Sequence, residues 1–181
     1  MIDQFASTVD SWTNFYMLAG SAAFVLLGLV FIAVSINIDI IAETSQNRDL
    51  TAFSSQVYLN FLAIAIISLV FVIPKQTPHG LGIGLLLIGL IETFRTAGLW
   101  RKFEIGYKGQ RQLNVNQFRR RLLIPNTICY LTLIIIISLS FIDGNTCYLD
   151  WMTMVVIWLL ISGTLSAWVL LLCLATLKSS Q

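Results

Sequence analysis

The chain has 181 residues, of which 57% are hydrophobic and only 11% are charged, and its mean hydropathy is +0.82. Soluble domains usually carry about 25% charged residues, so this composition does not fit a chain whose surface faces water. The formal net charge of +2 gives no strong attraction to nucleic acid. These properties predict an integral membrane protein, an all-α transmembrane helical bundle.

Five long apolar runs, separated by polar segments, each predict a helix that crosses the membrane. A bilayer core requires about 20 mostly apolar residues per helix. The first run follows aspartates instead of basic residues and is too long for a signal peptide, so we expect it to be retained. The predicted spans form one transmembrane domain over residues 1–181, with ranges 15–38, 57–73, 80–100, 122–142 and 151–177.

Charged residues interrupt the third run and leave two interpretations. The stretch from Gly80 to Ile91 is apolar, whereas Glu92 and Arg95 follow it closely. Either the helix crosses the whole membrane and holds both charges inside it, or the chain forms a re-entrant hairpin that ends near Ile91. We favour the full span, because the other four spans then alternate in direction.

The basic residues predict the orientation of the chain. Lys and Arg near the ends of spans stay on the cytoplasmic side. With the N-terminus outside, ten of the eleven basic residues face the cytoplasm, and only Lys75 lies outside. Residues 101–121 form the most basic segment and contain a single acid, Glu104. We therefore expect an outer N-terminus and a cytoplasmic C-terminus in the plasma membrane (the inner membrane of a bacterium).

Glu92 and Arg95 are the strongest candidates for a functional site. A charge inside the bilayer costs about 2.5–3.5 kcal/mol on insertion scales, so such residues rarely face lipid. Their spacing of three residues allows an ion pair on one helix. One arc of about 80° on this helix holds Gly82, Gly89, Glu92 and Thr96. The pair is either part of an ion or proton pathway, or a structural salt bridge in which Arg95 reaches toward lipid phosphates.

Polar side chains also gather in the cytoplasmic halves of the predicted spans. Asn60 and Asn126 are among them, and together with Tyr130 they are candidates to line a polar interior. One explanation is a vestibule that faces the cytoplasm and is closed outside by apolar residues. The other is hydrogen bonding between helices, a common role of such residues in membranes.

Small residues at short spacings predict close contact between helix backbones. The candidates are Gly80, Gly82, Gly84 and Gly89 on the third span and Gly163 on the fifth. The contacts could form within one chain or between copies. Because a chain with five short spans has little interior of its own, we expect a homo-oligomer.

The basic segment combines positive charge with aromatic residues at helical spacing, Trp100, Phe103 and Tyr107. An interfacial helix on an anionic membrane surface has this pattern, although ordinary positive flanking residues are the alternative. The candidates for binding anionic lipid headgroups are Arg101, Lys102, Lys108, Arg119, Arg120 and Arg121. We expect no nucleic-acid partner for so short a segment.

No residue pattern predicts catalysis, a metal site or a cofactor. The chain has one histidine, His79, and its three cysteines are widely spaced. The leading hypothesis is an oligomeric pore or ion-channel-like protein in which Glu92 and Arg95 control ion passage. One alternative is a non-conducting scaffold or accessory subunit that binds another membrane protein. The other is a membrane-perturbing effector whose basic segment senses a lipid or another signal.

Overall fold

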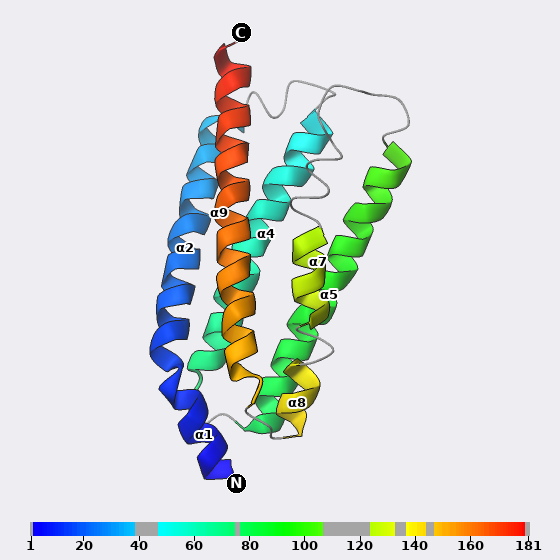
Figure 1. Ribbon diagram of the computed structural model, residues 1–181. Helices are drawn as coiled ribbons and strands as arrows, with labels where there is room; N and C mark the ends of the chain where they lie inside the picture. The colour runs from blue at the N-terminus through cyan, green and yellow to red at the C-terminus, as the bar shows by residue number, and fades with distance from the viewer. Residues whose placement is uncertain are drawn as a thin grey trace.

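The computed structural model describes residues 2–38, 47–74, 77–106, 124–132, 137–143 and 147–179. In these ranges the regular elements are all helices, and they form an elongated bundle (Figure 1). The helices are α1 (Ile2–Ser11), α2 (Thr13–Ile36), α4 (Asn47–Val72), α5 (Pro78–Gly106), α7 (Ile124–Thr132), α8 (Leu139–Ile142) and α9 (Leu149–Ser179).

Four of these helices are long and apolar enough to cross a membrane. Their apolar stretches are Thr13–Ile36, Ser54–Val72, Pro78–Gly98 and Leu149–Leu172. Large apolar side chains also cover the outer surfaces of α2, α5 and α9; Leu18 is 71% exposed and Phe94 is 72% exposed. Water solvates such a surface poorly, whereas lipid tails solvate it well. The fold is therefore that of an integral membrane protein.

α4 occupies the centre of the bundle. It contacts α2, α5 and α9, and 56% of its apolar stretch is buried, against 22% for α2. α7 contacts both α5 and α9. α5 and α9 both begin at the end of the bundle where the N-terminus lies and run toward the end where the C-terminus lies (Figure 1). The chain between them therefore returns along the bundle, and α7 and α8 lie on that return.

The predicted helical membrane class is confirmed, and four predicted spans correspond to α2, α4, α5 and α9. α5 continues without interruption through Glu92 and Arg95, so the re-entrant hairpin is wrong. The predicted span 122–142 is described as two helical pieces, α7 and α8. Residues 133–136, between these two pieces, lie outside the described residues. The count of five spans and the orientation stay predictions.

Aromatic rings from four helices fill the interior at the N-terminal end of the bundle. Tyr16 of α2 stacks on Phe71 of α4, with ring centroids 3.8 Å apart and 6° between the planes. Phe141 of α8 packs edge-on with Phe71 at 6.3 Å, and Phe5 of α1 packs edge-on with Phe141 at 6.1 Å. All four side chains are at most 2% exposed. We call these four residues the aromatic layer.

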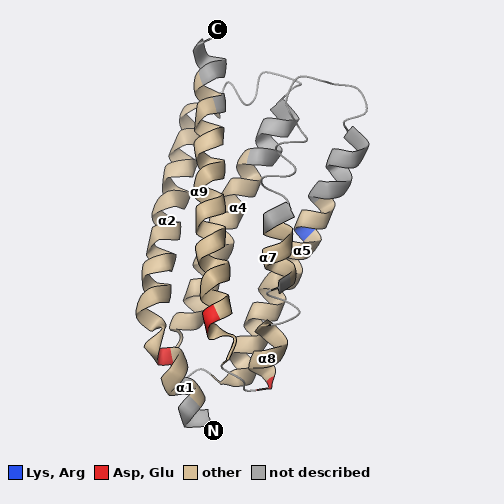
Figure 2. Cartoon of the chain, viewed as in Figure 1, with Lys and Arg blue, Asp and Glu red and all other residues tan. Residues whose placement is uncertain are grey.

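Exposed acidic side chains surround the same end of the bundle. They are Asp10 of α1, Asp143 directly after α8 and Asp150 in the first turn of α9. Among the residues coloured by charge in Figure 2, no Lys or Arg lies at this end. In the described part of the chain, the end that carries α1 and α8 is therefore acidic.

Two glycines of α5 allow neighbouring segments to approach closely. A Cβ atom on Gly84 would lie 3.4 Å from Cγ1 of Val70, so this glycine faces α4. A Cβ atom on Gly82 would lie 2.7 Å from Cγ1 of Ile142, which belongs to α8. The small residues predicted for backbone contact are thus used within the chain at these positions.

Candidate functional site

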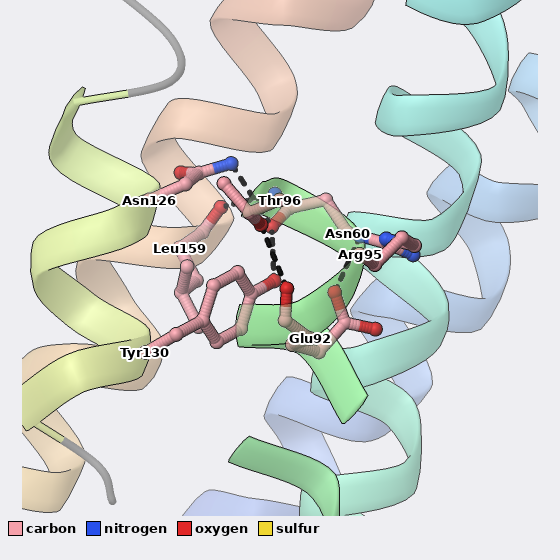
Figure 3. A network of polar contacts seen from close by, with 7 residues as sticks. All are labelled: Asn60, Glu92, Arg95, Thr96, Asn126, Tyr130 and Leu159. Carbon is pink, nitrogen blue, oxygen red and sulfur yellow. Dashed lines mark hydrogen bonds and ion pairs between the residues drawn. The ribbon is translucent and has the colours of Figure 1, made fainter. Parts of the chain in front are cut away.

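Buried polar side chains form a cluster between α4, α5, α7 and α9, with Asn60 of α4 at its centre (Figure 3). The side-chain nitrogen of Asn60 donates to the main-chain oxygen of Leu159 on α9 at 3.2 Å. Its side-chain oxygen accepts a hydrogen bond from the Tyr130 hydroxyl at 3.0 Å and a longer one from the Asn126 amide at 3.5 Å. One carboxamide thus connects α4 with both α7 and α9.

Asn126 extends this cluster to a second position on α9. Its side-chain oxygen accepts a hydrogen bond from the Ser162 hydroxyl at 2.8 Å. Asn60, Asn126 and Tyr130 are each at most 2% exposed. These contacts agree with the explanation that the polar residues join helices by hydrogen bonds. The three predicted lining residues lie together, inside the bundle.

Gly163 allows α9 to approach α4 at this point. A Cβ atom on Gly163 would lie 2.8 Å from the side-chain nitrogen of Asn60 and 2.9 Å from the ring of Phe61. Leu159, whose carbonyl oxygen accepts the Asn60 hydrogen bond, lies one helical turn before Gly163. The absence of a side chain at Gly163 therefore permits the hydrogen bond between α4 and α9.

Glu92 and Arg95 form an ion pair on α5. Glu92 is only 7% exposed, and the Thr96 hydroxyl donates to the main-chain oxygen of Glu92 at 2.8 Å. Figure 3 shows the pair next to Asn60 and Tyr130. Glu92 therefore lies in the interior beside the polar cluster, whereas the side chain of Arg95 is 20% exposed.

The ion pair and Asn60 lie at the same depth in the bundle. Asn60 is 13 residues after Asn47, where α4 begins, and Glu92 is 14 residues before Gly106, where α5 ends. At a rise of about 1.5 Å per residue, both lie about 20 Å from the ends of their helices, at the same end of the bundle. This end is opposite the aromatic layer, so the interior has a polar half and an aromatic half.

Gln56 and the half-buried Arg95 have buried atoms without a hydrogen-bond partner among the described residues, as does the half-buried Thr93 at its hydroxyl oxygen. Nη2 of Arg95 pairs with the Glu92 carboxylate, but Nε and Nη1 have no acceptor. Gln56 of α4 is 2% exposed, and neither its side-chain nitrogen nor its side-chain oxygen has a partner. A buried unpaired polar group costs free energy, so these residues call for an explanation.

Gln56 is absent from the predicted site because it precedes the apolar run that predicts a span over 57–73. The helix α4 begins ten residues before that run, at Asn47, and therefore includes Gln56. The spacing of four residues between Gln56 and Asn60 puts both on one face of a helix. That spacing was the available sequence signal for Gln56.

The predicted packing glycines of α5 differ in burial, and only some of the predicted headgroup residues lie in the described part of the chain. Gly82 and Gly89 are buried, Gly84 is half-buried and Gly80 is exposed. With Glu92 and Thr96 also buried, the predicted arc of α5 faces other helices. Of the predicted headgroup residues, Arg101 and Lys102 belong to the C-terminal part of α5, whereas Lys108, Arg119, Arg120 and Arg121 lie outside the described residues.

Within the described ranges, no three His, Cys, Asp or Glu residues come together as metal ligands would. Comparisons with protein-family models, with curated proteins and with solved structures find no match to this chain. The function of the polar cluster therefore has to be inferred from its own chemistry and its place in the membrane.

Proposed function

We propose that the protein conducts a small ion or polar solute across the plasma membrane, through the interior of each helical bundle. The observation that carries this proposal is the ion pair between the buried Glu92 and the half-buried Arg95 on a membrane-spanning helix. Desolvation of two charges offsets much of their attraction, so a buried ion pair contributes little net stability. Apolar side chains would hold α5 in the bundle equally well. A role in passage therefore explains the charged pair better than a role in folding.

The pathway in this proposal lies within one chain, not between copies. Asn60, Glu92 and Tyr130 are each at most 7% exposed and face the helices of their own bundle. Copies that assemble around a common axis would not bring these residues to that axis. The homo-oligomer expected from the size of the chain is then compatible with conduction but not required for it.

The proposal includes five spans, with the N-terminus outside and the C-terminus in the cytoplasm. In support, α5 and α9 run in the same direction, and α7 and α8 occupy the return path between them (Figure 1). Arg101 and Lys102 belong to the C-terminal part of α5, at the end opposite the aromatic layer, and basic residues near the ends of spans stay in the cytoplasm. The polar half then faces the cytoplasm, and the aromatic layer closes the outer half.

The scaffold alternative loses part of its basis. It depends on glycine faces that remain available to another membrane protein. Gly82, Gly84 and Gly163 instead meet side chains of their own chain within about 3.4 Å of an added Cβ atom. These three positions therefore offer no free face to a partner.

Ion flux through the purified protein in liposomes tests the proposal, with Glu92→Gln as the main variant. The control is Thr164→Val, because Thr164 is exposed on α9 and its hydroxyl bonds only to the carbonyl oxygen of Leu160 in the same helix. We expect Glu92→Gln to change the flux rate or the ion preference, since it removes the negative charge next to Arg95. Thr164→Val should leave both unchanged.

Two results would count against the proposal. Equal flux and equal ion preference in the wild type and in Glu92→Gln would remove Glu92 from the pathway. An absence of flux from a folded, monodisperse sample would refute conduction itself. The scaffold function would then be tested by gentle extraction and identification of a bound membrane protein.

A further inference from the structure

The buried Gln56 and the half-buried Arg95 carry buried polar atoms whose hydrogen-bonding capacity the polar cluster does not use. Gln56 is only 2% exposed, and both polar atoms of its side chain lack a hydrogen-bond partner among the described residues. Nε and Nη1 of Arg95 are buried and also lack an acceptor there. Asn60 and Asn126, by contrast, are bonded to neighbouring helices. The unpaired groups are therefore a second, distinct feature of the polar half.

The helix register brings these two side chains into the same interval between α4 and α5. Gly84 of α5 faces Val70 of α4. Arg95 is eleven residues after Gly84, about three turns, and Gln56 is fourteen residues before Val70, about four turns. From this register we infer that both residues lie on the sides of α4 and α5 that face each other. The two positions differ by about 4.5 Å along the bundle axis, a distance that the long Arg95 side chain can cover.

Hydrogen-bond donors predominate in this interval. Nε and Nη1 of Arg95 and the amide nitrogen of Gln56 all donate, whereas the acceptors are the Gln56 oxygen and the Glu92 carboxylate that already pairs with Nη2. A group that only accepts hydrogen bonds complements such a site. The planar guanidinium of arginine pairs especially well with a carboxylate, because two parallel N–H donors match its two oxygens.

We propose that Arg95 and Gln56 bind a small monocarboxylate anion, whose oxygens accept hydrogen bonds from the guanidinium and from the Gln56 amide. This inference rests on the proposed conduction and names the class of solute that passes. Glu92 shares the guanidinium with the anion and repels it. The repulsion limits the affinity, as a conducted solute requires, because it must both enter the site and leave it.

Acetate binding to the purified full-length protein in detergent tests this inference, with acetamide as a probe of similar shape without charge. A ligand that binds the folded state raises the unfolding temperature by mass action. At neutral pH we expect acetate to raise this temperature in a saturable manner. Acetamide and sodium chloride at equal concentration should not.

Two variants connect the effect to the site. Gln56→Leu should fold, because it removes an unpaired buried polar group, and should weaken acetate binding about tenfold, the effect of one hydrogen bond to a charged group. Glu92→Gln should tighten acetate binding, because it removes the repulsion and leaves Arg95 positive. Thr164→Val, outside the cluster, should bind acetate with wild-type affinity.

The results separate this inference from the proposed function. An absent acetate effect, or equal effects of acetate and acetamide, overturns the carboxylate site even if liposome flux is observed. Equal acetate affinity in the wild type and Gln56→Leu overturns the role of Gln56. Charge-selective binding that both variants change as expected supports the site, and an absence of flux would then refute conduction alone.

Discussion

Replacement of Gly163 by alanine perturbs the contact between α4 and α9 that positions the polar cluster. The added Cβ atom would lie 2.8 Å from the side-chain nitrogen of Asn60 and 2.9 Å from a ring carbon of Phe61. Non-bonded carbon atoms prefer separations of about 3.5–4.0 Å. The helices must therefore separate, or the two side chains must change rotamer. Either movement disturbs the 3.2 Å hydrogen bond from Asn60 to the Leu159 carbonyl oxygen.

Three contributions set the expected loss of stability. Overpacking of a well-packed interior costs about 1–3 kcal/mol. Disruption of the Asn60 hydrogen bond adds about 0.5–1.5 kcal/mol. The better helix propensity of alanine offsets about 1 kcal/mol on a scale measured in water. The free energy of unfolding should therefore fall by about 0.5–3.5 kcal/mol, with a central value of about 2 kcal/mol.

Gly28 of α2 supplies the matched control. A Cβ atom there would meet no other atom within 4 Å, so Gly28→Ala keeps the gain in propensity without the clash. Thermal unfolding of both variants in a mild detergent, followed by tryptophan fluorescence, gives the comparison. Gly163→Ala should unfold below the wild type, and Gly28→Ala at or above it. If the two variants are equally stable, α9 does not pack against Asn60 as described.

Two further substitutions test the two halves of the interior. Asn60→Leu should reduce the free energy of unfolding by about 1–3 kcal/mol, because the Tyr130 hydroxyl loses its acceptor in a buried position. If this variant unfolds thermally at the same temperature as the wild type, the cluster does not hold the helices together. Phe141→Ala should cost about 3–5 kcal/mol, because the ring is fully buried between Phe5 and Phe71. Chemical denaturation checks this value, and a loss below about 1 kcal/mol would argue against a packed aromatic layer.

Hydropathy predicts the helices that lipid requires and misses helical residues that lie beyond the apolar runs. α2 and α9 correspond to long apolar runs, because in lipid a helix satisfies its own backbone groups. α4 extends ten residues beyond the predicted span 57–73, and polar residues in that extension give no hydropathy signal. α1 was not predicted either. Its buried residues Phe5 and Val9 are four positions apart, a spacing typical of one helix face.

The residue types of the candidate site were predictable, whereas their partners were not. Glu92 and Arg95 stand out in any apolar run, because a charge in lipid is costly whatever the fold. Asn60 and Asn126 are 66 positions apart in the chain, and their contact depends on the rotation of α4 about its axis. Packing against other helices, for instance at Gly163, sets that rotation. The sequence alone does not specify the rotation. Gln56 was missed because it precedes the apolar run of the predicted span, although α4 includes it.

The hydrogen bonds of α7 can be completed only after α9 has been synthesised. Asn126 meets Asn60, 66 positions earlier, and Ser162, 36 positions later. A ribosome delivers the chain from its N-terminus, so α9 is the last helix to reach the membrane. Until then, Asn60 lacks the Leu159 carbonyl oxygen and Asn126 lacks the Ser162 hydroxyl. A nascent chain that ends before α9 would therefore hold the Asn60 and Asn126 amides in the membrane without these partners.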